Sequence, residues 1–367
     1  MKLLHIITRM NTGGPAVFLD HLTTSLSNLG CESVIAHGYC EPNETDYLES
    51  KKLTCTTISV GLLHRTLNPI HDVIAFWQIR KIIKITKPDL INTHTSKAGV
   101  LGRLAAKSIN KNIPVIHTFH GHLIYGYFAK FKSFLFTIIE KFMSIFTDLS
   151  IAVTSETKLS LQRLGIGKKG EWAVIPIGIP IKNSNNQIIN MNSGMHLLWV
   201  GRFTDIKDPI YALNTIKALL KLNKESFDLT MVGEGEMYDE IREKSKDLPI
   251  KFTGWLKDPF EKMIDFDLLL LTSKNEGLPL VMLEAANLER ATISRNVGGV
   301  SEFIKNESTG FLVNGDHNEM AKIISELASK KNKLMEVGAG AKSLLSSKFS
   351  VEIMAKKYYD TYKQLMV

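Results

Sequence analysis

The chain has 367 residues, of which 44% are apolar and 22% are charged, and its formal net charge is +8. This length exceeds what one hydrophobic core usually serves, so two domains are expected. The composition is that of a globular protein and excludes a disordered one. Three cysteines without a CxxC spacing argue against a disulfide framework or a zinc site and suit a reducing cytosol.

The basic charge suits nucleic acid, an anionic membrane surface or an anionic ligand. Nucleic acid ranks last, because the chain has no helix-turn-helix, zinc-finger or aromatic RNA-binding pattern. The opening run MKLLHIITRMN has too few consecutive apolar residues for a signal peptide. No stretch reaches the roughly 18 apolar residues of a membrane span. We therefore expect a soluble or peripheral cytoplasmic protein.

Short β-branched runs alternate with helical segments, which predicts parallel sheets with helices on both faces. A polar, asparagine-rich stretch interrupts this alternation and is typical of a linker. We expect an α/β protein with two Rossmann-like domains, at residues 1–181 and 196–349, joined by a linker at 182–195 and facing across a cleft that binds ligands at the strand ends. The expected strands are Leu3–Thr8, Ser33–His37, Leu90–His94, Val115–Phe119, Leu149–Val153 and Glu171–Pro176, then Leu197–Val200, Leu229–Val232, Lys251–Phe252, Leu268–Leu271, Ala291–Ser294 and Gly310–Val313.

The first glycine-rich segment is RMNTGGPA, residues 9–16, directly after the first expected strand. Gly13 and Gly14 predict a tight turn into a helix. The spacing is not GxGxxG, since no third glycine follows, so the signal for a dinucleotide is weak. A loop that closes over a phosphate or a sugar is the better interpretation.

Two helical segments combine basic and aromatic residues. Residues 76–87 put Phe76, Ile79 and Ile83 on one stripe, and such stripes face a core by default. The segment at 127–146 also carries phenylalanine around much of its circumference, together with lysines, which resembles an interfacial membrane anchor. Core packing and membrane contact therefore both stay open. The second segment repeats apolar residues at positions 128, 131, 135, 138, 142 and 145.

The segment HTFHGHLIYGY, residues 117–127, follows an expected buried strand and contains His117, His120 and His122. Alternating histidines suggest a metal, but no carboxylate accompanies them locally, so a metal site is not expected. His120 precedes a glycine at the strand end, which favours a histidine that lines the cleft.

Two cations follow the strand in HLLWVGRFTDIKDP, residues 196–209. The strand ends at Gly201, Arg202 is next, and Lys207 comes five residues later. Arginine forks onto two oxygens and lysine acts as a point charge, so the pair can neutralise a diphosphate.

The strongest segment is DLLLLTSKNEGLPLVMLEAANLERATISRNVGGVSEF, residues 267–303. Pro279 is expected at the first position of a helix, where proline is favoured, and Gly277 lets a ligand approach the backbone closely. Backbone N–H groups at such a helix start suit a phosphate. Glu276 and Glu284, if spanned by continuous helix, lie about 12 Å apart. Glycosidase carboxyls lie roughly 5–9.5 Å apart, so two ends of one long ligand are the better interpretation.

Together these motifs resemble the retaining GT-B glycosyltransferases of family 4 (group 1), over nearly the whole chain and most densely from 196 to 316. NEGLPLVMLEA resembles the family's Glu-x7-Glu signature, and VGRFTDIKD and NVGGVSEFI accompany it. The resemblance implies that Glu276 contacts the donor sugar and Glu284 the nucleotide ribose, while Arg202 and Lys207 hold the diphosphate.

The resemblance also puts the Gly13–Gly14 loop near the phosphates and His120 beside the transferred sugar. A last helix at about 350–367 is expected to cross back onto the N-terminal domain. No metal or other cofactor is expected. The implied catalytic residues are His120, Glu276, Arg202 and Lys207, and the implied donor-binding residues are Gly13, Gly14, Gly201, Arg202, Lys207, Leu256, Glu276, Gly277, Leu278, Pro279, Leu280, Val281 and Glu284.

The expected reaction is transfer of GalNAc, GlcNAc or Gal from a UDP-sugar to a polyprenyl-diphosphate-linked saccharide, as in O-antigen or other surface-polysaccharide synthesis. This acceptor implies a peripheral position on the inner face of the cytoplasmic membrane, which the basic aromatic helices suit. One alternative is a UDP-sugar 2-epimerase on the same fold, against which the Glu-x7-Glu signature argues. Another is a non-catalytic nucleotide-sugar-binding protein, against which the intact Arg202, Lys207, Glu276 and Glu284 argue.

Overall fold

A computed structural model describes residues 1–41, 44–121, 130–167, 171–182, 194–222, 226–256 and 265–366. The chain divides into two compact units. Residues Met1–Pro180 and Ser350–Val367 form the first unit, and Ile181–Phe349 form the second. The segments 183–193 and 122–129, which include most of the expected linker and His122, lie outside the described residues.

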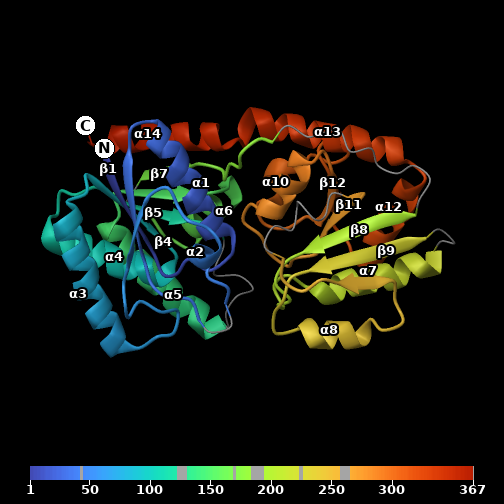
Figure 1. Ribbon diagram of the computed structural model, residues 1–367, viewed down its shortest axis with the longest axis horizontal. Helices are drawn as coiled ribbons and strands as arrows, with labels where there is room; N and C mark the ends of the chain where they lie inside the picture. The colour runs from blue at the N-terminus through green and yellow to red at the C-terminus, as the bar shows by residue number, and fades with distance from the viewer. Residues whose placement is uncertain are drawn as a thin grey trace. The chain divides into compact units, whose positions relative to one another are not determined.

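The first unit is built on a seven-stranded sheet with the order β3-β2-β1-β4-β5-β6-β7, in which every pairing is parallel (Figure 1). The chain reverses direction across the sheet between β1 and β4, the switch point where doubly wound folds bind ligands. The strands are β1 Lys2–Ile7, β2 Glu32–His37, β3 Thr56–Ser59, β4 Leu90–His94, β5 Val115–Phe119, β6 Leu149–Ala152 and β7 Glu171–Val174.

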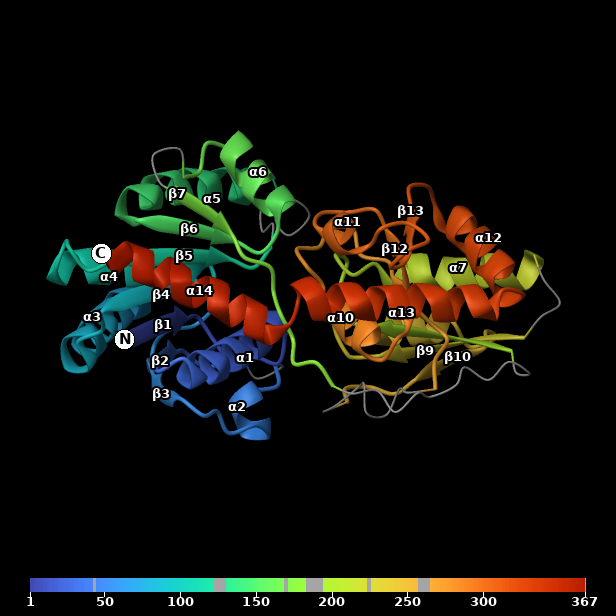
Figure 2. The ribbon, with the colours of Figure 1, turned by 90° about the horizontal axis from the view of Figure 1, so that it is seen from above.

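Helices cover both faces of this sheet. The last helix of the chain, α14, packs beside α1 on one face, while α3, α4 and α5 cover the other (Figures 1 and 2). The side of β1 that bears Leu4 and Ile6 packs on α3 and α4, so His5 points to the opposite side, toward α1 and α14. The helices of this unit are α1 Gly14–Asn28, α2 Tyr47–Ser50, α3 Pro69–Thr86, α4 Ser96–Ile109, α5 Lys130–Met143, α6 Ser155–Arg163 and α14 Val351–Met366, with a 3-10 turn at Ser144–Phe146.

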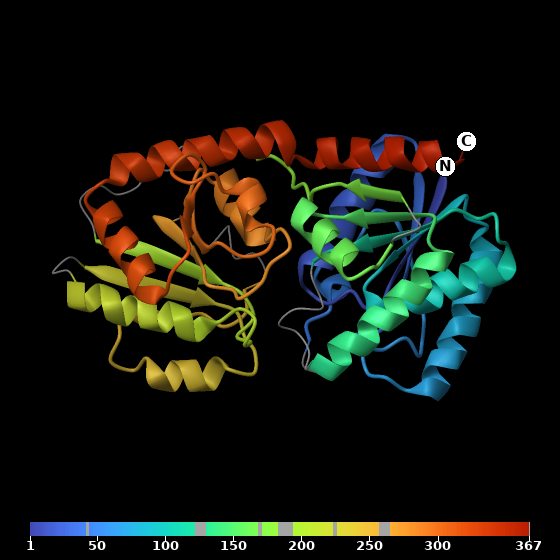
Figure 3. The same ribbon diagram turned by 180° about the vertical axis from the view of Figure 1, so that it is seen from behind.

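The second unit has a parallel six-stranded sheet with the order β10-β9-β8-β11-β12-β13 and its switch point between β8 and β11. Helix α7 packs against α12, and α10 packs against α13 (Figure 3). The strands are β8 Met195–Val200, β9 Phe227–Val232, β10 Ile250–Phe252, β11 Leu268–Leu271, β12 Ala291–Arg295 and β13 Phe311–Val313. The helices are α7 Pro209–Leu222, α8 Tyr238–Lys244, α10 Leu280–Asn287, α11 Val300–Phe303, α12 His317–Ala328 and α13 Lys331–Lys348.

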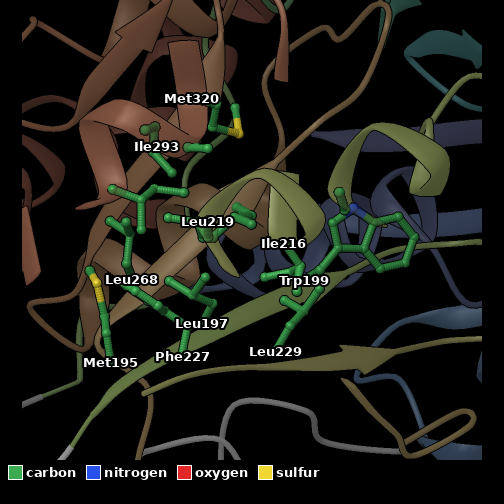
Figure 4. Close-up of a cluster of buried hydrophobic side chains, with 14 of the residues drawn as sticks. Met195, Leu197, Trp199, Ile216, Leu219, Phe227, Leu229, Leu268, Ile293 and Met320 are labelled. Carbon is green, nitrogen blue, oxygen red and sulfur yellow. The ribbon is translucent and has the colours of Figure 1, made fainter. Parts of the chain in front are cut away.

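The core of the second unit fills the space between α7, α12 and the sheet. Leu197 and Trp199 of β8 pack with Ile216 and Leu219 of α7 and with Met320 of α12, all of them buried (Figure 4). This packing fixes β8, so that the loop after it leaves the sheet from a rigid strand end.

These two parallel sheets confirm the predicted α/β class with two Rossmann-like domains. All twelve expected strands form, with ends that shift by at most two residues. One strand was missed: β3 at Thr56–Ser59 is mostly exposed at the edge of its sheet. An edge strand with little buried surface carries no apolar alternation, so its sequence gives no strand signal.

The described part of helix α5 does not bury the apolar stripe that its sequence repeats, and positions 128 and 131 of that stripe lie outside the described side chains. Leu135, Ile138, Phe142 and Ile145 at the end of this segment are all exposed, whereas Glu140 is fully buried. The default expectation of a core-facing stripe is therefore wrong for this helix. The physical reason is the buried ion pair between Glu140 and Arg103, which turns Glu140 inward.

Candidate functional site

The structure brings Lys207 and Glu276 into direct contact. Lys207 lies in the loop after β8 and Glu276 in the loop after β11, and these strands are neighbours on the two sides of the switch point. The Lys207 Nζ donates to Glu276 Oε1 across 2.5 Å, and Ser273 Oγ donates to the same oxygen across 2.6 Å. The Lys207 and Glu276 side chains are 24% and 10% exposed. Because both bonds fall on Oε1, the second carboxylate oxygen has no partner among the described residues.

Backbone and side-chain hydrogen bonds hold the two loops together. Trp199 Nε1 donates to Thr272 Oγ1 across 2.9 Å, and Thr272 Oγ1 donates to the Lys207 carbonyl across 3.0 Å. The Lys274 N–H donates to the Ile206 carbonyl across 2.8 Å. The Lys207 backbone is therefore fixed to the loop that carries Glu276, which holds the two charged groups at a set separation.

A second ion pair, between Arg295 and Asp208, holds the loops that carry Lys207 and Glu276. Arg295, at the end of β12, donates from Nη1 to Asp208 Oδ2 and to the Thr272 carbonyl, each across 3.2 Å. Its guanidinium lies 4.7 Å from the centre of the Tyr211 ring, a cation–π contact. Burial raises the pKa of Tyr211 to about 12, so its hydroxyl stays protonated. No local sequence pattern indicates this group, because Arg295 lies 87 positions from Asp208.

Two glycines bring the loop after β12 against Glu276. The Gly299 N–H donates to the Glu276 carbonyl across 3.1 Å. Gly298 has φ +53°, and a Cβ there would lie 1.9 Å from the same carbonyl oxygen. A residue with a side chain does not fit this approach. The double glycine of NVGGVSEF therefore shapes the backbone on which Glu276 is carried.

Helix α10 begins one residue later than expected. Pro279 has φ −65° and ψ 122°, an extended conformation, so it precedes the helix, which starts at Leu280. The 12 Å estimate for Glu276 and Glu284 assumed continuous helix and is wrong in that respect, because Glu276 to Pro279 are not helical. Glu284 lies half-buried inside the helix.

No side chain caps the start of α10. The first-turn N–H groups, those of Leu280 and Val281 among them, have no acceptor within the helix, as at any helix start. Gly277 is half-buried just before this turn, and the Leu278 side chain is buried at 4% exposure. Leu278 therefore contributes packing, and any contact it makes with a ligand is through its backbone.

Arg202 and Gly201 follow β8 directly. The Arg202 side chain is exposed, and within the described ranges it forms no ion pair. Gly201 is fixed by Gly233 in the loop after β9: Gly233 has φ +128°, and a Cβ on it would lie 2.0 Å from the Gly201 carbonyl oxygen. Gly233 was not predicted as a site residue, although the VGEGE pattern after a buried strand was the available sequence signal.

Leu256 does not lie with the other predicted donor-binding residues. Leu256 lines a groove of about 800 Å³ along β8, β9 and β10, together with Thr230, Lys251 and Thr253. None of the other predicted donor-binding residues lines that groove.

In the first unit, the predicted residues follow the ends of β1 and β5. Helix α1 begins at Gly14, and Gly13 before it is extended, with φ 174°. His120 comes directly after β5 and meets Phe18 of α1 edge-on, with ring centres 4.7 Å apart. Burial lowers the pKa of His120 to about 4, so the ring is neutral at physiological pH. His117 is buried and bonds Thr93 across 2.9 Å, which identifies it as a packing residue.

Among the described residues, no group of three or more histidines, cysteines or carboxylates is placed to hold a metal ion. In the same part of the chain, none of the helices combines the length and the apolar character needed to span a membrane.

Comparison with known proteins identifies both units. Residues 12–183 match the model of "Glycosyltransferase Family 4", and residues 194–330 match that of "Glycosyl transferases group 1". A UDP-Gal:alpha-D-GlcNAc-diphosphoundecaprenol alpha-1,3-galactosyltransferase of Escherichia coli is 25% identical over 343 residues, which cover 88% of this chain and 87% of the relative. A Campylobacter jejuni GalNAc-alpha-(1->4)-GalNAc-alpha-(1->3)-diNAcBac-PP-undecaprenol alpha-1,4-N-acetyl-D-galactosaminyltransferase is 24% identical, with 93% of each chain covered.

Solved structures agree on the fold. Anabaena HepE in complex with UDP and glucose superposes with a TM-score of 0.80 at 19% identity, covering 99% of this chain and 100% of that one. Sucrose-phosphate synthase from Thermosynechococcus elongatus reaches a TM-score of 0.83 at 20% identity, with 100% and 99% covered. Both matched family models describe glycosyltransferases, and together they span nearly all of the two sheets. The chain therefore belongs to the family 4 (group 1) glycosyltransferases of the GT-B fold.

Proposed function

We propose that this glycosyltransferase moves a hexose or N-acetylhexosamine from a UDP-sugar to a polyprenyl-diphosphate-linked saccharide, with retention of configuration, in O-antigen or other surface-polysaccharide synthesis. The observation that carries the proposal is the Lys207–Glu276 contact at the switch point of the second sheet. It presents a cation and a carboxylate side by side where doubly wound folds bind nucleotides.

In this proposal Glu276 and Lys207 bind different parts of the donor, the sugar and the diphosphate. The free oxygen of Glu276 accepts hydrogen bonds from sugar hydroxyls, while the Lys207 ammonium faces the diphosphate. Arg202, exposed and near the same strand end, adds a planar cation that suits phosphate oxygens. Glu284, four residues into α10, is assigned to the ribose, and the uncapped start of α10 offers N–H groups to a phosphate.

The proposed chemistry is stabilisation of a leaving diphosphate. As the sugar–phosphate bond breaks, negative charge grows on the diphosphate, and in this proposal Arg202, Lys207 and the helix N–H groups stabilise it. The acceptor hydroxyl then attacks the oxocarbenium-like sugar on the face from which the diphosphate leaves. A diphosphate oxygen takes the hydroxyl proton, so no protein base is required.

The relatives support the choice of donor and acceptor. The Escherichia coli relative carries UDP-Gal and a diphosphoundecaprenol acceptor in its name, and the Campylobacter jejuni relative names an undecaprenol-linked acceptor. Both names specify an α linkage. Transfer from an α-linked UDP-sugar into an α-glycosidic bond retains the anomeric configuration, which agrees with the proposal.

The test is a panel of UDP-Gal, UDP-GalNAc, UDP-GlcNAc and GDP-sugars, each incubated with polyprenyl-diphosphate-linked saccharides and read by mass spectrometry. We expect one UDP-sugar to be transferred, with an α anomeric signal by NMR. Glu276→Gln is expected to lower the transfer rate at least about a hundredfold, as loss of a preorganised polar contact at a reacting centre does. Glu240→Gln, which removes an exposed carboxylate on α8, is the matched control and should leave the rate unchanged.

Other outcomes of the same panel contradict the proposal. A full transfer rate for Glu276→Gln removes the role given to Glu276, and a β product removes retention. Conversion of the donor sugar without any acceptor identifies the 2-epimerase alternative. Tight donor binding without transfer to any acceptor identifies a nucleotide-sugar-binding protein.

A membrane position is the second part of the proposal, and α5 supports it. Phe134 and Phe142 of α5 are 63% and 56% exposed, and Ile145 in the 3-10 turn that follows is 69% exposed. Monomeric soluble proteins rarely expose apolar patches of this kind without a partner. Exposed Lys141 accompanies them, and basic residues beside an apolar helix face fit an anionic lipid surface.

Helix α3 carries a similar surface. Ile70 and Trp77 are 73% and 59% exposed, and Lys81 and Lys84 are exposed on the same helix. Helices α3 and α5 both pack against α4, on one face of the first sheet (Figure 3). We propose that this face rests on the anionic surface of the membrane that holds the lipid-linked acceptor.

Vesicle flotation tests the membrane proposal. At low salt, the protein is expected to float with vesicles containing phosphatidylglycerol and to stay in solution with purely zwitterionic vesicles. A Trp77→Ser/Phe142→Ser double variant should lose this binding, while the control Leu222→Ser, at an exposed apolar residue of α7 in the second unit, should keep it. Equal flotation of the double variant, or no flotation of the wild-type chain, would overturn the membrane part.

A further inference from the structure

Asp208 puts a negative charge directly beside the lysine that is proposed to face the donor diphosphate. It follows Lys207 in the chain and is the last residue before α7. Its Oδ1 accepts from the Tyr211 N–H across 3.2 Å, as the side chain of a helix N-cap does. Asp208 therefore helps to begin α7, but its carboxylate repels an anionic ligand unless another charge offsets it.

The backbone fixes this carboxylate in the loop. Asp208 has φ +49°, a left-handed conformation that aspartate tolerates better than most residues with a side chain. Its N–H donates to the Thr204 and Asp205 carbonyls, each across 3.2 Å. The Asp208 side chain is only 17% exposed, so the carboxylate is held against the protein and is not turned into solvent.

Arg295 supplies an offsetting charge from another strand. It lies at the end of β12, which is the neighbour of β11 in the sheet. Its Nη1 donates to Asp208 Oδ2 across 3.2 Å, and its side chain is 26% exposed. Since the oxygen that Arg295 contacts is not the one that caps α7, Asp208 keeps both contacts at once.

More negative charge surrounds the same ring of α7. Burial raises the pKa of Tyr211 to about 12, and the Arg295 charge acts in the opposite direction. The carboxylates that raise this pKa further are those of Asp316, Glu319 and Asp208. Because Tyr211 stays neutral, it takes none of the Arg295 charge, and removal of Arg295 leaves uncompensated carboxylates in this part of the unit.

Each carboxylate in the loops that follow β8 and β11 is paired with one cation. The pairs are Lys207–Glu276, Lys274–Asp205 and Arg295–Asp208. Arg202 is then left exposed and without an ion pair in the part of the chain that the structure describes. These loops therefore present a net positive charge to a ligand only while Arg295 neutralises Asp208.

We propose that Arg295 is a positioning residue for donor binding that acts through charge: it neutralises Asp208, so that the Lys207 ammonium stays available to the diphosphate. The proposal rests on the donor site proposed above and assigns Arg295 a role that goes beyond holding the loops together. Without Arg295, an unpaired carboxylate lies one residue from the phosphate-binding lysine and competes with the diphosphate for it.

UDP binding to the full chain, measured by calorimetry at low salt, tests this role. Arg295→Met removes the charge and keeps an apolar side chain beside the Tyr211 ring. Two unit charges about 10 Å apart, at an effective dielectric constant of about 20, change a binding constant roughly tenfold, so the Kd of UDP should rise about tenfold. The double variant Arg295→Met/Asp208→Asn removes both charges and keeps an amide oxygen for the α7 cap, so it should recover most of the lost affinity.

Two further measurements separate the charge of Arg295 from its contacts. The ratio of the Arg295→Met Kd to the wild-type Kd should shrink as the salt concentration rises, because salt screens the exposed part of the interaction. The affinity for uridine, which carries no phosphate, should be the same in Arg295→Met and in the wild-type chain. A loss of UDP affinity that the double variant does not restore, or an equal loss for uridine, would overturn the proposal, because either shows that the loop itself has moved.

Lys244→Met is the matched control, since it removes one cation from an exposed ion pair on α8 of the same unit. It should leave the Kd of UDP unchanged, and urea unfolding checks that all variants fold. Asp208→Asn alone leaves Arg295 as an added positive charge and should tighten UDP binding at low salt, which tests the proposal independently of Arg295→Met. Weaker binding by Asp208→Asn would contradict it.

Failure of this inference is distinguishable from failure of the proposed function. A wild-type chain that binds no UDP refutes the donor site itself. A wild-type chain that binds UDP, with no recovery of affinity in the double variant, refutes only the role given to Arg295.

Discussion

Gly298 shows how a single residue supports the site without touching a ligand. Its φ is +53°, and an added Cβ would lie 1.9 Å from the Glu276 carbonyl oxygen. Only a residue without a side chain allows the loop after β12 to approach Glu276 so closely.

Gly298→Ala is therefore expected to destabilise the second unit and to lower the transfer rate, because the clash moves the Glu276 backbone. Gly30→Ala is the matched control: Gly30 also has a positive φ, +76°, but a Cβ there meets nothing within 4 Å. The left-handed conformation alone costs about 1–2 kcal/mol of unfolding free energy in each variant. Any further loss in Gly298→Ala is therefore attributed to the clash. Urea denaturation measures the free energy of unfolding of both variants, and equal losses would contradict this account.

At the level of single residues, candidate site residues could be predicted where one local motif indicates their chemistry. Lys207 and Glu276 each follow a buried strand and were predicted for separate roles, Lys207 on the diphosphate and Glu276 on the donor sugar. Their contact across 2.5 Å is seen only in the structure. The contact of Asp208 with Arg295 could not be predicted either, because its members are 87 positions apart. Sequence spacing carries no information on contacts between distant strand ends until the strand order is known.

At the scale of elements, α5 is the informative case. Its sequence repeats apolar residues at helical spacing, which by itself indicates a buried stripe. The structure instead buries Glu140, whose carboxylate accepts two hydrogen bonds from Arg103 Nη2 across 2.9 and 2.8 Å. Arg103 of α4 is itself buried and also donates to the Gly99 carbonyl and to Thr147. This network sets the rotation of α5, so Leu135, Ile138 and Phe142 face outward.

Removing one member of this pair is expected to be severe. Glu140→Gln leaves the Arg103 guanidinium buried without its counter-charge, which typically costs about 3–5 kcal/mol. The double variant Arg103→Met/Glu140→Leu removes both charges and should recover most of that stability. Unfolding in urea, followed by circular dichroism, measures the difference. Equal stability of Glu140→Gln and the wild-type chain would show that the pair does not hold α5.

The exposed pair Lys244–Glu240 on α8 provides the comparison for that experiment. Both side chains are about half-exposed, at 51% and 47%. Exposed pairs of this spacing contribute roughly 0.3–0.5 kcal/mol, so Glu240→Gln should change the urea midpoint very little.

At the scale of the whole molecule, buried neutral histidines make stability depend on pH. The pKa of His5, His21 and His120 is about 4 in the folded chain, against an ordinary value of 6.5. Burial is the main cause for each, and at His21 the Asp20 carboxylate and the Lys51 ammonium act in opposite directions. Below pH 6.5 the unfolded chain binds protons that the folded chain does not. The free energy of unfolding therefore decreases as the pH is lowered.

We expect the melting temperature to be constant above about pH 6.5 and to fall as the pH is lowered toward 4. The range from 5.0 to 6.5 is the most informative, because carboxylates titrate mainly below it. His21→Gln removes one of these histidines and should make the fall shallower. A melting temperature that stays level or rises as the pH drops from 6.5 to 5.0 would contradict the prediction.

Local sequence patterns predicted the class of the fold, which the two parallel sheets confirm, and the residues of a donor site, which stay a prediction. Strand–helix alternation, two glycine-containing strand ends and the Glu276–Glu284 spacing are local patterns, and local patterns report secondary structure and functional groups directly. Tertiary structure alone decided which groups meet. The orientation of α5, the support of Lys207 by Arg295, and the hydrogen bonds that join His5, His94 and His120 all depend on strand order and burial, which join residues far apart in the chain.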